Sequence, residues 1–158
     1  MSAVTLKQAN RIIEAIFQQG AKLDCRPLAA IVVEPGCKVK AFQKEDSSSM
    51  VRFEMAFGKC YAALALGRSS SLVKIRAGKK PLFMEFLQDS NGRQLFPEGG
   101  GRLIRDKNGE VIGAVGVTGD TEERDEELAA HGIRAAGLKV DEDFKKLGRR
   151  AGIRLEDK

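Results

Sequence analysis

The residue whose type and surroundings best suit chemistry is Lys59, because it lies in an apolar segment. Residues 50–66 carry alanine and phenylalanine around most of a helical circumference, which predicts a largely buried helix. A lysine there either extends its ammonium group to solvent or is desolvated and faces an anionic ligand or a carboxylate. Desolvation would lower the pKa of its ammonium group. The sequence leaves both alternatives open.

A glycine-rich block follows at Glu98–Gly119, reading EGGGRLIRDKNGEVIGAVGVTG. Its Asn108-Gly109 pair between two apolar runs predicts a β-hairpin closed by a type I′ turn. The three glycines after Glu98 lead into a strand rather than a helix, and they do not match the GxGxxG phosphate loop. They form either a flexible turn or a nest of backbone N–H donors for a carboxylate or phosphate.

A small-molecule pocket for an anionic ligand can be assembled from these groups. The catalytic candidates are Lys59, Glu98 and Asp46, with the lysine as acid/base or anion anchor and a carboxylate to position it. The ligand-binding candidates supply a cation, backbone donors, a strand end and a further carboxylate, and they are Arg68, Gly99, Gly100, Gly101, Thr118, Gly119 and Asp125.

The composition limits the classes of protein to which this chain can belong. The 158 residues are 42% hydrophobic and 31% charged, as expected for one globular domain. The net charge of +5 is spread along the chain, and aromatic residues make up 6% without tryptophan, which argues against nucleic-acid binding. No apolar run approaches the roughly 18 residues of a membrane span. The N-terminus does not resemble a secretory signal.

Cysteine usage and motifs narrow the class further. The three cysteines, Cys25, Cys37 and Cys60, form no CxxC pair, so reduced thiols in a cytoplasmic protein are expected. The sequence contains no HExxH motif that would indicate a metal site. It also contains no Walker loop and no serine–histidine–aspartate order that would indicate a familiar catalytic centre.

Helices and hairpins alternate along the chain, which predicts an α+β layered domain with a mostly antiparallel sheet. We expect a single domain at residues 1–140 and a charged extension at residues 141–158. The expected elements are a helix at Val4–Gln19 capped by Thr5, strands at Leu28–Val33 and Lys38–Lys44 around a type II turn, the helix at 50–66, one or two short helices within 72–91, a short strand at Gln94–Pro97, a hairpin at Arg102–Thr118, and a helix from Thr121 towards Gly132 or Gly137.

Five segments follow one another along residues 4–137: MAFGKCYAAL, Gly67-Arg68-Ser69-Ser70, Gly99–Gly101, IGAVGVTG and Asp125-Glu126. In their order and sequence they resemble the GlcG/HbpS-like family, also called the haem-degrading domain and found at the C-terminus of PduO-type proteins. The sequence departs from the family pattern at Arg102-Leu103, where the family usually has a proline, and at Ser47, where it often has glycine.

The resemblance implies a profilin-like fold with helices on both sides of the sheet. It also implies a homo-oligomer, as a dimer, tetramer or octamer, and haem or a related tetrapyrrole as ligand. His131 is the only histidine, and it is either an axial haem ligand or a surface residue near a helix end. Three hypotheses remain: a haem-binding protein, a small catabolic enzyme that transfers a proton on a carboxylated metabolite, and an assembly protein without ligand.

Overall fold

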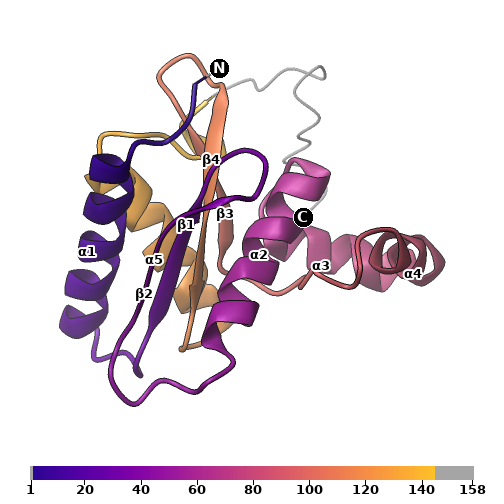
Figure 1. The fold of residues 1–158 in the computed structure, drawn as a ribbon, viewed down its shortest axis with the longest axis horizontal. Coiled ribbons are helices and arrows are strands. Elements are labelled where there is room, and N and C mark those ends of the chain that lie inside the picture. Colours follow the sequence, from indigo (N-terminus) through magenta and orange to yellow (C-terminus); the bar gives the residue numbers. More distant parts are fainter. Residues whose placement is uncertain (1, 145–158) are drawn as a thin grey trace.

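The computed structural model describes residues 2–144, and the predicted C-terminal extension lies outside the described residues from residue 145 onward. Figure 1 shows the chain as a sheet with helices on both sides. The described elements are α1 (Leu6–Lys22), β1 (Ala29–Val33), β2 (Val39–Lys44), α2 (Arg52–Leu66), α3 (Ser70–Lys79), α4 (Pro81–Ser90), β3 (Gly101–Arg105), β4 (Val111–Thr118), α5 (Glu122–Ala135) and the short 3₁₀ helix η1 (Asp141–Asp143).

The four strands form one antiparallel sheet in the order β2-β1-β4-β3. Strand β4 is central, and its Val115 lies opposite Val32 of β1 and Arg102 of β3. All residues of β1 and β3 are buried, as are all residues of β4 after Val111. The predicted α+β class is therefore confirmed, and β4 is a central strand covered on both faces.

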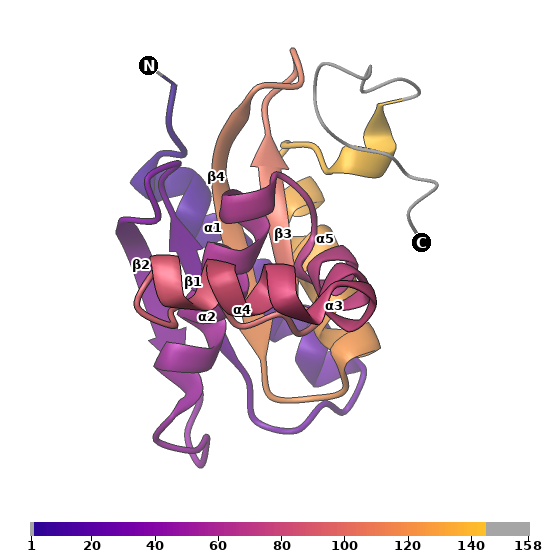
Figure 2. The ribbon, with the colours of Figure 1, turned by 90° about the vertical axis from the view of Figure 1, so that its right-hand side faces the viewer.

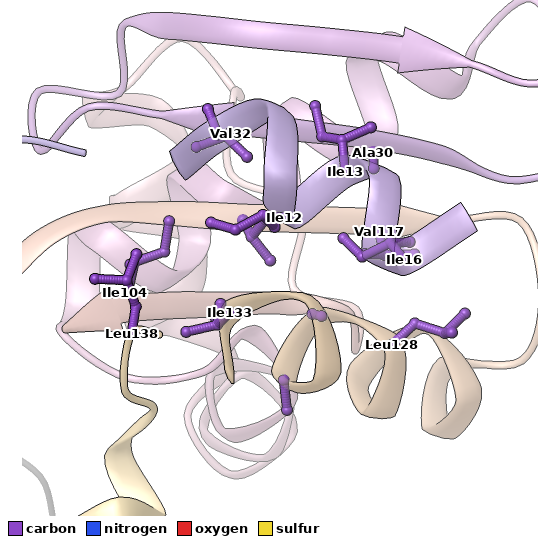
Figure 3. Packing of buried hydrophobic residues seen from close by; sticks show 14 of the residues in the cluster. Ile12, Ile13, Ile16, Ala30, Val32, Ile104, Val117, Leu128, Ile133 and Leu138 are labelled. Atoms are coloured by element: carbon purple, nitrogen blue, oxygen red, sulfur yellow. The ribbon is translucent and has the colours of Figure 1, made fainter. Parts of the chain in front are cut away.

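Helices α1 and α5 cover one face of the sheet, and α2 covers the other. The larger core cluster joins the apolar stripe of α1, which includes Ile12 and Ile16, to Leu128 and Ile133 of α5 (Figure 3). Thr5 caps α1 as predicted, because its side chain accepts a hydrogen bond from the Gln8 amide. Helices α3 and α4 lie outside α2, and α4 is the outermost element on that side (Figure 1).

Glycines in the sheet allow α2 to pack unusually close to it. A Cβ atom at Gly116 would lie 2.2 Å from the carbonyl oxygen of Ala56, and one at Gly101 would lie 2.2 Å from that of Lys59. On the outer side of α2, a Cβ atom at Gly58 would lie 2.6 Å from the Phe96 Cβ. The glycines of the block thus allow the backbone of α2 to lie close to the backbone of the sheet.

Three local predictions are wrong. Gln94–Pro97 is not a strand, because the Phe96 amide donates to the carbonyl of Gly58 in α2 instead of to a neighbouring strand. In the hairpin turn only Gly109 has a positive φ, at 86°, whereas a type I′ turn needs two such residues. The first hairpin is not a type II turn, because the positive φ is at Cys37 rather than at Gly36.

The helical boundaries largely follow the prediction. The segment 72–91 contains two helices, and the break falls between Lys79 and Pro81, whereas Gly78 remains inside α3. Gly20 does not end α1 but lies within it, packed against Leu28. No helix among the described residues is long and apolar enough to cross a membrane.

Candidate functional site

Lys59 is buried and paired with Asp125. Its side chain is 3% exposed and that of Asp125 is 2% exposed. The Nζ atom donates to the Val117 carbonyl at 2.8 Å and to Asp125 Oδ2 at 3.2 Å. The other carboxylate oxygen of Asp125 accepts from the Asp120 amide at 3.0 Å. The pair therefore joins α2, β4 and the start of α5, and Lys59 does not reach solvent.

Burial opposes charge on both members of this pair. Desolvation lowers the pKa of Lys59, and the Asp125 carboxylate partly offsets that effect. Desolvation raises the pKa of Asp125, and the Lys59 ammonium partly offsets it. Gly100, with φ 124°, closes over the pair, since a Cβ atom there would lie 3.1 Å from Lys59 Nζ. The ammonium group is enclosed by protein atoms rather than presented to a ligand.

Two backbone donors of the glycine run, the Gly99 and Gly101 amides, are used within the protein. The Gly99 amide donates to Glu122 Oε1 at 2.9 Å, and the Gly101 amide donates to Ser70 Oγ at 2.8 Å. Of the two alternatives left open for these glycines, a flexible turn or an anion nest, neither describes these two amides, which hold a carboxylate and a hydroxyl of this chain.

Glu98 and Glu122 form a carboxyl pair at the surface. Lys74 lies 3.2 Å from Glu98 Oε2 and 2.6 Å from Glu122 Oε2. Because the two carboxyl groups hydrogen-bond each other through a proton, the pKa of Glu98 is raised and that of Glu122 is lowered to about 2. Lys74 and the Gly99 amide also contribute to the lowering. Glu98 thus belongs to this pair, and its ion-pair partner is Lys74 rather than Lys59.

The remaining predicted residues are dispersed. Thr118 Oγ1 accepts a hydrogen bond from Arg52 at 3.2 Å. Gly119 has no side chain and so leaves room for the Pro27 carbonyl oxygen beside it. Asp46 is exposed in the loop after β2, and no hydrogen bond or ion pair among the described residues joins it to Lys59. Arg68 lines a small pocket on α3. Of the predicted set, the structure brings together Lys59, Gly100, Gly101 and Asp125.

A groove of about 720 Å³ lies between α3 and α5. Figure 2 shows these two helices beside β3. We call it the α3–α5 groove, and its lining combines an apolar wall with charged groups: Ser69, Ser71, Leu72, Ile75, Arg102, Glu123, Glu126, Glu127, Ala130, His131, Arg134 and Glu142. His131 is exposed and lines this groove.

Arg102 is the buried cation of the α3–α5 groove. It pairs with Glu126 at 3.6 Å and with Glu142, and Ser71 Oγ donates to Glu126 at 2.7 Å. Its Nε atom is buried without a hydrogen-bond partner among the described residues. Sequence analysis missed Arg102 as a site residue. The available signal was an arginine directly after the glycine run and directly before the apolar pair Leu103-Ile104.

A second groove, of about 470 Å³, lies beside the first turns of α2. We call it the aromatic groove, since its lining is rich in phenylalanine: Phe53, Glu54, Met55, Phe57, Arg93, Gln94, Leu95 and Phe96. Phe53 stacks on Phe57 with ring centroids 6.1 Å apart. This groove contains a thioether but no imidazole.

Comparison with known proteins identifies the family. A curated relative from Citrobacter freundii, an uncharacterized 15.0 kDa protein from the dhaT-dhaS intergenic region, is 28% identical over 129 residues, which cover 82% of this chain and 89% of the relative. The crystal structure of Klebsiella pneumoniae ORFY has a TM-score of 0.76 and 24% identity, with 87% of this chain and 92% of that chain covered.

Two further solved structures have the same fold. A double mutant of Streptomyces reticuli HbpS has a TM-score of 0.74 and 21% identity, covering 85% of this chain and 87% of that one. A PduOC:heme complex has a TM-score of 0.73 and 19% identity, covering 86% and 96%. The family model described as haem degrading protein HbpS-like matches residues 4–134. The chain belongs to the HbpS-like family.

Proposed function

We propose that this protein binds haem or a related tetrapyrrole in the α3–α5 groove, with His131 as the axial ligand. The observation that carries the proposal is the position of His131, whose side chain lines the α3–α5 groove. Histidine is a common protein ligand of haem iron. The groove volume lies within the range of small-molecule and cofactor sites, roughly 300–1,000 Å³.

The residues of the groove fit an iron porphyrin. Leu72, Ile75 and Ala130 offer an apolar surface for the ring, and His131 offers a nitrogen for the iron. The buried Nε of Arg102, which has no hydrogen-bond partner in residues 2–144, is a spare donor in the same lining. When bound, haem supplies an iron whose reactivity depends on its axial ligand and on the polarity of the pocket.

The comparisons support this choice of ligand indirectly. One solved relative is a heme complex, and its 19% identity to this chain establishes a shared fold alone. The family description names haem degradation, which makes a tetrapyrrole the ligand class to test first. We do not extend the proposal to proton transfer by Lys59, since its ammonium group is enclosed and paired.

Hemin titration tests the proposal. We expect wild-type protein to shift the Soret band and to saturate at one hemin per chain. His131→Ala should weaken binding on the order of tenfold or more and alter the Soret maximum, since the axial nitrogen is lost. Asn10→Ala, an exposed change on α1, is the control and should behave as wild type. Identical spectra and affinities for wild type and His131→Ala would refute axial ligation by this residue.

We further propose that the protein self-associates through α4. Leu82 and Phe86 lie one helical turn apart on this helix and are 80% and 68% exposed. Adjacent exposed apolar side chains on one helix face are typical of an interface. Light scattering after size exclusion should give an oligomer for wild type and a smaller species for Leu82→Glu/Phe86→Glu. An unchanged mass in the double variant would show that α4 does not form the interface.

We infer that the protein functions in a reducing compartment, such as the cytoplasm. Cys25, Cys37 and Cys60 are all free in the structure. Burial raises the pKa of Cys25 and of Cys37 to about 11 and raises that of Cys60 well above its usual value. These thiols remain protonated near neutral pH and are poor nucleophiles.

A further inference from the structure

A small pocket on α3 is lined, within the described part of the chain, by four cations and two apolar side chains and by no acidic residue. We call it the basic pocket, and its lining residues are Arg68, Leu72, Ile75, Arg76, Lys79 and Lys80. Its volume is about 150 Å³. The sequence between Glu54 and Glu85 contains no aspartate or glutamate, although it contains Lys59, Arg68, Lys74, Arg76, Lys79 and Lys80. The local charge is therefore strongly positive.

Carboxylates of the chain neutralise the other lysines of this segment. Lys59 pairs with Asp125, and Lys74 pairs with Glu98 and Glu122. Across residues 2–144, by contrast, no ion pair involves Arg76, Lys79 or Lys80. These three cations have charge available for a ligand.

The Arg76 side chain is oriented by a neighbouring ring, and its Nε atom donates no hydrogen bond within the described residues. Its guanidinium carbon lies 4.7 Å from the centroid of the Phe83 ring, a cation–π contact that orients the side chain. Its Nε atom is buried and has no hydrogen-bond partner within the described part of the chain. An ordered guanidinium with a spare donor suits a carboxylate, which arginine binds in a bidentate manner.

The basic pocket and the α3–α5 groove share a wall. Leu72 and Ile75 line both of them, so the two sites lie on either side of this apolar ridge. On the groove side, the carboxylates of Glu123 and Glu127 repel an anionic substituent of the ligand. On the other side the lining is cationic. A ligand with an apolar ring and anionic arms would thus be oriented by charge across the ridge.

We propose that the basic pocket is the subsite for the carboxylates of the ligand whose ring lies in the α3–α5 groove. This inference rests on the proposed tetrapyrrole function for the position of the ring. Arg76, Lys79 and Lys80 receive the carboxylates, while Leu72 and Ile75 contact the edge of the ring. The subsite sets ligand orientation and selects acidic porphyrins over their neutral esters.

Paired titrations with hemin and hemin dimethyl ester test the subsite. Wild type should bind hemin on the order of tenfold more tightly than the ester, and Lys79→Gln/Lys80→Gln should abolish this preference. Both lysines are exposed, so folding should be unaffected. Lys7→Gln/Lys22→Gln on α1 removes the same charge elsewhere and should keep the preference. Arg76→Gln should reduce the preference as a second, independent variant.

The outcomes separate the subsite from the function. Equal affinities of wild type for hemin and its ester, unchanged in Lys79→Gln/Lys80→Gln, would overturn the subsite and leave tetrapyrrole binding intact. If hemin does not bind at all, the proposed function fails. Calorimetry with inorganic pyrophosphate then tests whether the basic pocket binds anions. Saturable pyrophosphate binding that is lost in Lys79→Gln/Lys80→Gln would support an anion site there, and no binding would overturn it.

Discussion

Replacing Lys59 with methionine is expected to lower the free energy of unfolding by about 3–5 kcal/mol. Methionine fills a similar volume but leaves the Asp125 carboxylate buried without its ion-pair partner. It also removes the donor to the Val117 carbonyl at the end of the central strand. Urea unfolding monitored by circular dichroism measures this loss.

The matched control for this prediction is Lys74→Met. Lys74 also contacts two carboxylates, yet its side chain is 47% exposed, so its removal should cost no more than about 1 kcal/mol. If Lys59→Met were as mild as Lys74→Met, the buried pair would not be a structural link between α2, β4 and α5.

The pH dependence of Lys59→Met provides a second check. Burial raises the pKa of Asp125 above its usual value of 3.8, and loss of Lys59 removes the largest effect that lowers it. The folded variant therefore binds a proton at pH values where the unfolded chain does not. Its free energy of unfolding should rise as the pH falls through the raised pKa towards 3.8. Lys59→Met/Asp125→Asn, which has no charge at either position, should lack this rise.

Replacing Gly116 with alanine is the second change with a large expected effect. The added Cβ would lie 2.2 Å from the Ala56 carbonyl oxygen and 3.0 Å from Cys60 Sγ, so α2 must move away from the sheet. Overpacking of this kind costs about 1–3 kcal/mol, and a backbone contact favours the upper part of that range. Thermal and urea unfolding should both show the loss.

Gly78→Ala is the opposite case and serves as the control. Nothing lies within 4 Å of a Cβ atom at this position in α3, and alanine favours a helix by roughly 0.8–1 kcal/mol over glycine. We expect this variant to be more stable than wild type. A Gly116→Ala variant with wild-type stability would contradict close packing of α2 on β4.

Much of the fold is readable from local patterns, whereas turn geometry is not. The apolar strands and the stripe of α1 specify their own burial through periodicity. The Asn108-Gly109 turn differs from the prediction because Asp106 Oδ1 accepts hydrogen bonds from the Asn108 and Glu110 amides. These side-chain contacts stabilise a loop in which only Gly109 needs a positive φ.

The candidate site was less predictable, because its contacts span the chain. The environment of Lys59 indicated burial, but its partner Asp125 is 66 residues away in α5. Likewise, Leu72 and Ile75 acquire a role only when α3 packs beside α5 and His131. No local spacing relates these positions. The glycine run was misleading for the same reason, since the Gly99 and Gly101 amides bond to Glu122 and Ser70 of other elements.

The most direct test of tetrapyrrole binding is a crystal structure of the wild-type protein with hemin, recorded at the iron absorption edge. We predict one anomalous peak in the α3–α5 groove beside the His131 imidazole, with the porphyrin carboxylates directed towards Arg76, Lys79 and Lys80. An iron peak in the aromatic groove beside Met55, or at any site away from His131, would contradict the proposal.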